Sequence, residues 1–273
     1  MVETVTGTAR SAGVDYTDLL ASDSHPVRDI HKAESPMPPG PTVVDASAYY
    51  SREFHDLEVE KLWKRVWQMA CHEDDIPNVG DSFVYDIANL SFIVVRTDEQ
   101  EFRAYPNACL HRGRALLHES EQGLYEFRCP FHGWAWHLDG TLKEVPCHWD
   151  FPTVDKDSHS LRSLPIGRWG GFVFINPDPN CEPLEDFLGD LSSQFPHVPF
   201  ERRYKAAHII KRLDCNWKVA QEAFMEAYHC VATHPTLLPT LGDANTKYDV
   251  FGNYSRAMSP SMTISPHVNE YYQ

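Results

Sequence analysis

The chain has 273 residues, and its 39 acidic and 24 basic residues give a formal net charge of −15 at pH 7. This balance disfavours nucleic acid and anionic membranes as partners. The sequence shows no apolar run of membrane-spanning length and no signal peptide. We therefore expect a cytoplasmic protein whose seven cysteines, without any C-x-x-C pair, are reduced or bound to metal.

The first seventy residues predict an irregular start followed by a helix. Residues 1–40 mix small and polar residues and end in a proline-rich stretch at 36–41, which predicts a flexible arm and a stiff linker. Residues 46–70 carry apolar residues at helical spacing, so we expect one amphipathic helix there. The residues that we assign to its buried face are Tyr50, Phe54, Leu57, Leu62, Trp63, Val66 and Trp67.

The middle of the chain predicts an all-β unit. Segments rich in β-branched and aromatic residues alternate with turn-forming residues, as expected for a meander and a hairpin. The turn Asp139-Gly140 is a hairpin signal. The predicted strands are 82–87, 91–96, 101–105, 134–138, 141–145 and 171–176.

Two short motifs between these strands supply metal-binding side chains. Cys109-Leu110-His111 is followed, after seventeen residues, by Cys129-Pro130-Phe131-His132, and we call these two motifs the clips. A Rieske [2Fe–2S] cluster is held by two Cys on one iron and two His on the other. A structural zinc site is the alternative. However, zinc clips usually pair like with like, whereas each clip here offers one Cys and one His, so we favour the cluster.

A second group of candidate ligands follows a short predicted helix at 183–195 and a strand-like segment at 204–213. From Asp214 to about Val231 the composition favours a helix, which would place Glu222, Glu226 and His229 on one face. His234 lies about 140° further round an ideal helix than His229. Both can bind one ion only if the helix loosens or ends between them, and the His-Pro pair supplies that break.

The clips carry a family resemblance. Cys109-Leu110-His111-Arg112-Gly113, together with Cys129-Pro130-Phe131-His132-Gly133-Trp134, resembles the Rieske domain of ring-hydroxylating oxygenase large (α) subunits. The resemblance implies an α+β protein: an all-β Rieske [2Fe–2S] domain plus part of a helix-grip-like α+β catalytic domain. We expect the flexible arm at 1–40, a helix packing on the catalytic portion at 41–70, the Rieske domain at 71–180 and the N-terminal part of the mononuclear-iron domain at 181–273.

The stretch from Glu226 to His234 is similar to the family motif Asp-x-x-His-x-x-x-x-His. The resemblance implies that His229 and His234 are ligands of a mononuclear Fe(II). Glu226 takes the place of the acid that bridges the two metal centres, so it would join His229 to His132 of another protomer. Aromatic-ring dioxygenases usually have Asp here, while Glu appears in some relatives, including oxygenases that act on quaternary amines. Glu222 is interpreted as a base near the iron, an extra ligand or a solvated acid.

The third iron ligand of the family is an acid far beyond the second His, in the C-terminal part of the catalytic domain. This sequence continues for 39 residues after His234, and its acids there are Asp243, Asp249 and Glu270. None of them has a setting that matches the family position. We expect that the chain lacks the C-terminal part of the catalytic domain; the alternative is that a local acid such as Glu222 completes the site.

The resemblance implies a terminal oxygenase that inserts oxygen from O₂ into an organic substrate, aromatic or otherwise ring-shaped. Electrons would come from NAD(P)H through a ferredoxin, a flavin reductase or both, because no G-x-G-x-x-G run for nicotinamide exists here. We expect a homotrimer, with or without a small β subunit. The alternatives are a monooxygenase that demethylates O- or N-methyl groups, quaternary amines included, or a truncated electron-transfer subunit without catalysis.

Overall fold

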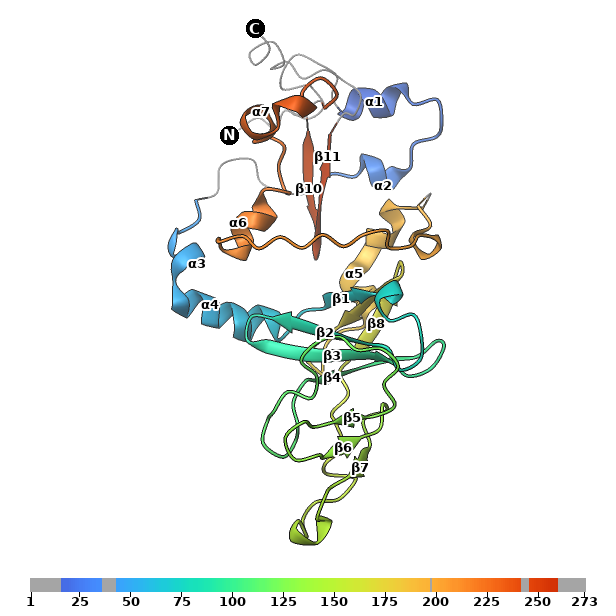
Figure 1. Cartoon of the computed structure of the whole chain (residues 1–273). Coiled ribbons are helices and arrows are strands. Elements are labelled where there is room, and N and C mark those ends of the chain that lie inside the picture. The colour runs from blue at the N-terminus through green and yellow to red at the C-terminus, as the bar shows by residue number, and fades with distance from the viewer. Residues whose placement is uncertain (1–15, 36–42, 197, 242–245, 260–273) are drawn as a thin grey trace. The chain divides into compact units, whose positions relative to one another are not determined.

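The computed structural model describes residues 16–35, 43–196, 198–241 and 246–259, which form two compact units (Figure 1). The clip unit comprises residues 52–187 and 198–210. The motif unit comprises the described parts of residues 1–51, 188–196 and 211–273. Helices and strands both contribute, so the expected α+β class is confirmed. Within the described residues, none of the helices has the length and hydropathy that crossing a membrane requires.

The clip unit is built from three antiparallel sheets of three strands each, in the orders β2-β3-β4, β5-β6-β7 and β1-β9-β8. The predicted meander, the hairpin and the last strand are all present, while β1, β5 and β8 were not predicted. The strands are β1 (Gln68–His72), β2 (Ser82–Ile87), β3 (Leu90–Arg96), β4 (Phe102–Pro106), β5 (Phe127–Arg128), β6 (Ala135–Trp136), β7 (Leu142–Glu144), β8 (Ile166–Trp169) and β9 (Phe172–Ile175).

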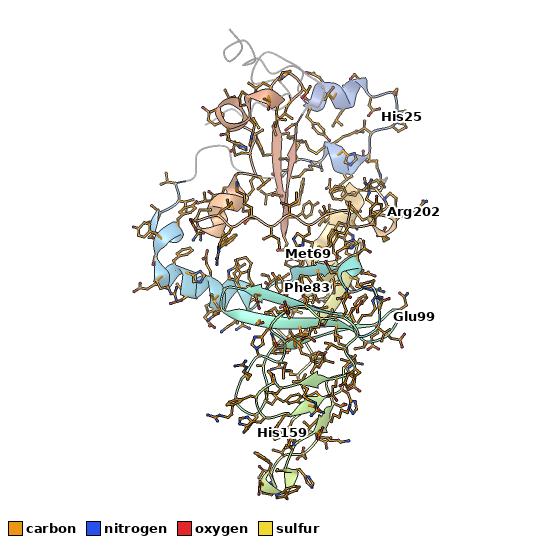
Figure 2. The ribbon with its side chains drawn as sticks, viewed as in Figure 1. His25, Met69, Phe83, Glu99, His159 and Arg202 are labelled. Atoms are coloured by element: carbon orange, nitrogen blue, oxygen red, sulfur yellow. The ribbon has the colours of Figure 1, made fainter. Side chains whose placement is uncertain are left out.

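The core of the clip unit lies on both faces of β3. Ile93 and Val95 point into one apolar cluster, and Phe92 and Val94 point into another, because successive side chains of a strand face opposite sides. The first apolar cluster also contains the cysteines of both clips, Trp134 just after the second clip, and Trp136 of β6. It extends to the loops around the β5-β6-β7 sheet, where His159 lies (Figure 2). The cysteines of both clips are therefore part of the hydrophobic core.

The single helix predicted for residues 46–70 is wrong. The structure has α3 (Ser47–Tyr50), a break at Ser51, α4 (Arg52–Glu58) and one π-helical turn (Val59–Trp63) before β1 begins. The predicted buried face fails in part, since Tyr50 is 79% exposed and Leu57 is 58% exposed. The helix ends early because Gln68 to His72 pair with β9, a ladder that helical spacing within the segment cannot reveal.

The described residues of the motif unit form short helices and one hairpin. Besides α3, the helices are α1 (Tyr16–Ser22), α2 (Asp29–Lys32), α6 (Trp217–Glu222) and α7 (Cys230–Thr233). The hairpin is the β10 (Lys247–Phe251)–β11 (Tyr254–Met258) pair, which the sequence did not predict. The short helix predicted at 183–195 corresponds to α5 (Leu184–Leu188) and the 3₁₀ turn Gly189–Gln194.

The strand predicted for residues 204–213 is absent from the described residues. This segment has no regular secondary structure, and the side chains of Tyr204, Ile209 and Ile210 are exposed. β-branched composition indicates a strand only where a partner strand accepts its ladder hydrogen bonds. No ladder hydrogen bond joins this segment to a described strand.

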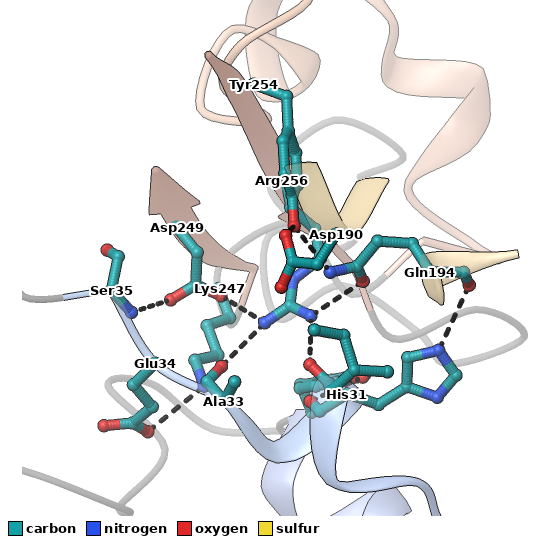
Figure 3. Close-up of polar contacts among 12 residues, drawn as sticks. His31, Ala33, Glu34, Ser35, Asp190, Gln194, Lys247, Asp249, Tyr254 and Arg256 are labelled. Atoms are coloured by element: carbon teal, nitrogen blue, oxygen red, sulfur yellow. Dashed lines mark hydrogen bonds and ion pairs between the residues drawn. The ribbon is translucent and has the colours of Figure 1, made fainter. Parts of the chain in front are cut away.

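The expectation of a flexible arm is wrong for residues 16–35, which form α1 and α2 and pack beside the β10–β11 hairpin (Figure 3). The Arg256 side chain is 8% exposed, and its guanidinium donates hydrogen bonds to the carbonyls of Ile30 and Ala33 at 2.7 Å each and to Asp249 Oδ2 at 2.8 Å. The Ser35 amide donates to the other Asp249 oxygen at 2.9 Å. A long-range polar network, which local composition does not reveal, orders this segment. Residues 1–15 and the linker at 36–41 lie outside the described residues.

Candidate metal centres

The two clips have the same backbone construction although they differ in spacing. The Cys109 amide donates a 2.8 Å hydrogen bond to the carbonyl of Arg114, five residues later in the chain. The Gly113 amide donates a 2.8 Å hydrogen bond to the Cys109 carbonyl. Cys129 and Gly133 repeat both hydrogen bonds, at 2.8 and 3.0 Å. Each glycine has φ +75°, a left-handed conformation that costs glycine nothing and lets the loop close tightly.

The structure brings the four predicted cluster ligands together as one pair of thiols and one pair of imidazoles. The thiols of Cys109 and Cys129 are buried and within hydrogen-bonding distance of each other. The rings of His111 and His132 have centroids 4.8 Å apart, and His132 is exposed. In the described part of the chain, no three or more His, Cys, Asp or Glu side chains form a ready-made site for one ion. The pairing of thiol with thiol and imidazole with imidazole is the pairing that two differently ligated irons require.

The electrostatic surroundings of the clips suit a bound cluster. Burial raises the pKa of the Cys109 thiol, although the backbone amides of His111 and Arg112 donate to its sulfur and oppose that shift. Burial also lowers the pKa of His111, assisted by the positive charges of His132 and Arg112. A lowered pKa favours the neutral form of His111, which is the ligand form of imidazole, and a buried thiolate pair needs a cation beside it. The donor set fits a [2Fe–2S] cluster on these grounds.

The first clip is held by a buried residue that the sequence analysis missed. Asn107 Oδ1 accepts hydrogen bonds from the amides of Leu116 and Leu117 at 2.9 and 3.0 Å. Its Nδ2 donates to the Leu117 carbonyl at 2.8 Å. The side chain thus joins the end of β4 to the chain that leaves the clip, and no sequence pattern marks it as buried.

The second clip is tied to the sheet by a charged group. Arg128 donates to the Gly133 carbonyl at 2.9 Å, to Glu126 at 2.6 Å and to Glu144 at 2.8 Å. Lys143 also donates to Glu126, at 2.6 Å. These hydrogen bonds hold the pKa of Glu126 below its ordinary value. The mixture of charges in β5 and β7 was the only sequence signal for this group.

The single helix predicted for residues 214–231 is wrong, so Glu222, Glu226 and His229 do not share one helical face. Helix α6 is capped by Asn216, ends at Glu222 and is followed by turns until α7 begins at Cys230. The Ala227 amide donates to the Tyr248 hydroxyl of β10 at 2.8 Å instead of continuing the helix. A contact from a distant strand therefore breaks the helix.

The break nevertheless brings together three of the predicted residues. Glu226 Oε1 lies 2.6 Å from His229 Nδ1, and its Oε2 accepts from the His229 amide at 3.0 Å. Helix α7 ends at Thr233, and the rings of His229 and His234 have centroids 5.3 Å apart. Burial raises the pKa of Glu226, but the two hydrogen bonds from His229 outweigh it and hold that pKa below its usual value. An ionised Glu226 fixes the proton on Nδ1 and leaves Nε2 of His229 available to a metal.

The other acids that were considered as iron ligands have partners elsewhere or lie outside the described residues. Glu222 accepts a hydrogen bond from the Tyr49 hydroxyl at 2.6 Å. Asp249 pairs with Arg256 at 2.8 Å. Asp243 and Glu270 lie outside the described residues. The pair of imidazoles with its carboxylate fits part of a non-haem iron site.

Comparisons with known proteins agree with this fold. Residues 66–155 match the Rieske [2Fe-2S] domain, and residues 199–272 match the ring hydroxylating alpha subunit catalytic domain. The class is thus a Rieske protein with a segment of an oxygenase catalytic domain. The chain belongs to the large subunits of the Rieske non-haem iron oxygenases.

Individual relatives include monooxygenases and dioxygenases. The carnitine monooxygenase oxygenase subunit of Escherichia coli is 29% identical over 214 residues, which cover 78% of this chain and 57% of that protein. The anthranilate 1,2-dioxygenase large subunit of Acinetobacter baylyi is 34% identical over 199 residues, covering 69% and 42%. The chain therefore spans about half the length of the curated relatives that it matches.

Solved structures show the same two kinds of enzyme. A quaternary ammonium Rieske monooxygenase in complex with L-carnitine superposes with a TM-score of 0.70 at 26% identity, covering 78% of this chain and 61% of that one. A naphthalene 1,2-dioxygenase from Rhodococcus bound to indole gives 0.59 at 32% identity, covering 71% and 46%.

Proposed function

We propose that Cys109 and Cys129 bind one iron of a Rieske [2Fe–2S] cluster, that His111 and His132 bind the other, and that His229 and His234 bind a mononuclear Fe(II). The observation that carries the proposal is the pair of clip loops with the same hydrogen bonds, which set thiol against thiol and imidazole against imidazole. When bound, the cluster supplies one-electron transfer and the mononuclear iron supplies oxygen chemistry.

The residues of this chain contribute positions and charges to that chemistry. Glu226 orients His229 through the 2.6 Å contact with Nδ1, which supports the role of a positioning acid. We propose that it also accepts a hydrogen bond from His132 of a neighbouring protomer, because His132 is the exposed imidazole of the clips. A homotrimer, with or without a small β subunit, would provide that neighbour.

The whole protein is proposed to be a terminal oxygenase in the cytoplasm. A ferredoxin, a flavin reductase or both would supply electrons from NAD(P)H, and oxygen from O₂ would enter an organic substrate with an aromatic or other ring. The 34% identity to the anthranilate 1,2-dioxygenase large subunit supports the ring substrate.

A second candidate is a monooxygenase that removes a methyl group from a quaternary amine. The presence of Glu226, where aromatic-ring dioxygenases usually have Asp, favours it, and so does the likeness to carnitine and glycine betaine monooxygenase subunits. The two candidates differ in their substrates. With a reductase and NADH, oxygen uptake on adding L-carnitine or glycine betaine would favour the quaternary-amine monooxygenase. Oxygen uptake on adding anthranilate or naphthalene would favour the oxygenase with a ring substrate.

The first experiment is to measure iron and acid-labile sulfide per chain after anaerobic purification, with the electron paramagnetic resonance (EPR) spectrum of the reduced protein. About two irons and two sulfides with a Rieske signal would support the cluster, and a third iron would support a mononuclear site within this chain. Cys129→Ala should lose the cluster, whereas Cys147→Ala, at an exposed cysteine outside the clips, should keep it. Zinc without sulfide would refute the proposal. A loaded chain that accepts electrons but never consumes O₂ would indicate an electron-transfer subunit without catalysis.

A further inference from the structure

The two imidazoles of the clips have different surroundings. The ring of His111 stacks on Trp134, with centroids 5.0 Å apart and planes 8° from parallel. Phe151 meets both rings edge-on, at 5.7 Å from His111 and 5.4 Å from Trp134. The ring of His132 is exposed and lies beside Phe131. One imidazole is therefore packed among aromatic rings while the other faces outward.

The rings around His111 are themselves fixed. Trp134 is 3% exposed and lies in the core, 6.3 Å from the ring of Trp136. Trp136 in turn donates from its indole nitrogen to the His159 carbonyl at 2.8 Å. A buried indole with such neighbours cannot turn without disrupting the core, so it also fixes the plane of the imidazole that stacks on it.

Phe151 separates His111 from a surface hollow. The hollow has a volume of about 290 Å³, and Leu142, His148 and Val154 line it together with Phe151. Because Phe151 also contacts His111 and Trp134, it stands between this hollow and the imidazole. Shortening the side chain would open a path for water toward His111.

We propose that Trp134 and Phe151 are positioning residues for His111, which fix the plane of its imidazole and keep water away from this side of the cluster. The inference rests on the proposed cluster. Two ferric ions, two sulfides, two thiolates and two neutral imidazoles sum to zero charge, and one added electron makes the reduced cluster negative. Dry, apolar surroundings disfavour the charged form, so these residues lower the reduction potential of the cluster.

The test compares Trp134→Phe and Phe151→Leu with a matched control, Trp149→Phe, at a tryptophan that is 70% exposed. The reduction potential is measured by titration of the EPR signal, and the couplings of the two ligating nitrogens by pulsed EPR. Both test variants should shift the potential upward and change the coupling of one nitrogen more than the other. The control should match the wild type in both measurements.

The outcomes separate this inference from the proposed function. If Trp134→Phe and Phe151→Leu keep two irons and two sulfides with unchanged potential and couplings, the positioning role is wrong. If Trp134→Phe fails to fold, Phe151→Leu decides, because this partly buried ring can shrink without removing a core tryptophan. If the wild-type chain binds no cluster, the proposed function fails and the positioning role fails with it.

Discussion

Replacing the glycine of the first clip by alanine tests whether the loop conformation holds the cluster ligands. Gly113 has φ +75°, and a Cβ atom built there meets no atom within 4 Å, so the change adds backbone strain without a clash. Holding alanine in the left-handed region costs about 1–2 kcal/mol. Alanine also restricts the unfolded chain more than glycine does, which offsets about 0.4–1 kcal/mol of this cost. Gly113→Ala should therefore lower the free energy of unfolding by about 1 kcal/mol.

The second clip and a different substitution supply the controls. Gly133 has the same φ, but its Cβ would lie 3.4 Å from Pro146 Cγ, so Gly133→Ala should cost at least as much. Gly113→Asn should cost less than Gly113→Ala, because Asn tolerates the left-handed region. Urea denaturation of the cluster-loaded chain, followed by cluster absorbance and far-UV circular dichroism, measures each value. An unchanged midpoint for Gly113→Ala, or an equal loss for Asn and Ala, would refute the reasoning.

Three further changes test the charged groups. Glu226→Gln should weaken retention of the mononuclear iron by about 10–100-fold and slow its reduction while sparing the cluster signal. Glu222→Gln is the control, and equal iron losses from the two variants on dialysis against a chelator would contradict the role of Glu226 in orienting His229. Arg256→Met should lower the free energy of unfolding by about 3–5 kcal/mol, because it leaves a buried carboxylate without its partner. The more peripheral Lys247→Met should cost less than about 1 kcal/mol, and thermal unfolding compares the two. Glu126 has a lowered pKa, so its stabilisation is complete above its unfolded pKa of about 4.3 and is lost as the pH falls through its folded value. The stability difference between wild type and Glu126→Gln, measured by urea denaturation, should therefore shrink as the pH falls below about 4.3, and a difference that stays constant would argue against this pairing.

Elements that a segment specifies by itself were predictable. The alternating strands β2, β3 and β4 and the Asp139-Gly140 hairpin lie where side-chain pattern and turn residues place them. The core on both faces of β3 agrees with its continuous apolar run. In these elements local propensity and tertiary packing favour the same conformation.

Elements that depend on a distant partner were not predictable. Helix-favouring residues continue past Glu222, yet no helix runs from there to His229, since the Ala227 amide donates to the Tyr248 hydroxyl instead of to a helical carbonyl. The helix predicted for residues 46–70 gives way to β1 because β9 pairs with it. The segment at 16–35 is ordered because Arg256 reaches its carbonyls. In each case a hydrogen bond from far along the chain decides the backbone conformation.

The sequence by itself determined the chemistry that the protein offers: the thiols and imidazoles of the clips, their short spacings, and the His229–His234 pair with its carboxylate. Ligand type and local spacing are properties of a few consecutive residues, so they can be read without a fold. Only the tertiary structure decided that Cys109 faces Cys129, that His111 lies beside His132, and that Trp134 and Phe151 pack against the ring of His111. That arrangement requires two loops, separated by seventeen residues, to be supported by one core, and it is the long-range packing of that core that sets them side by side.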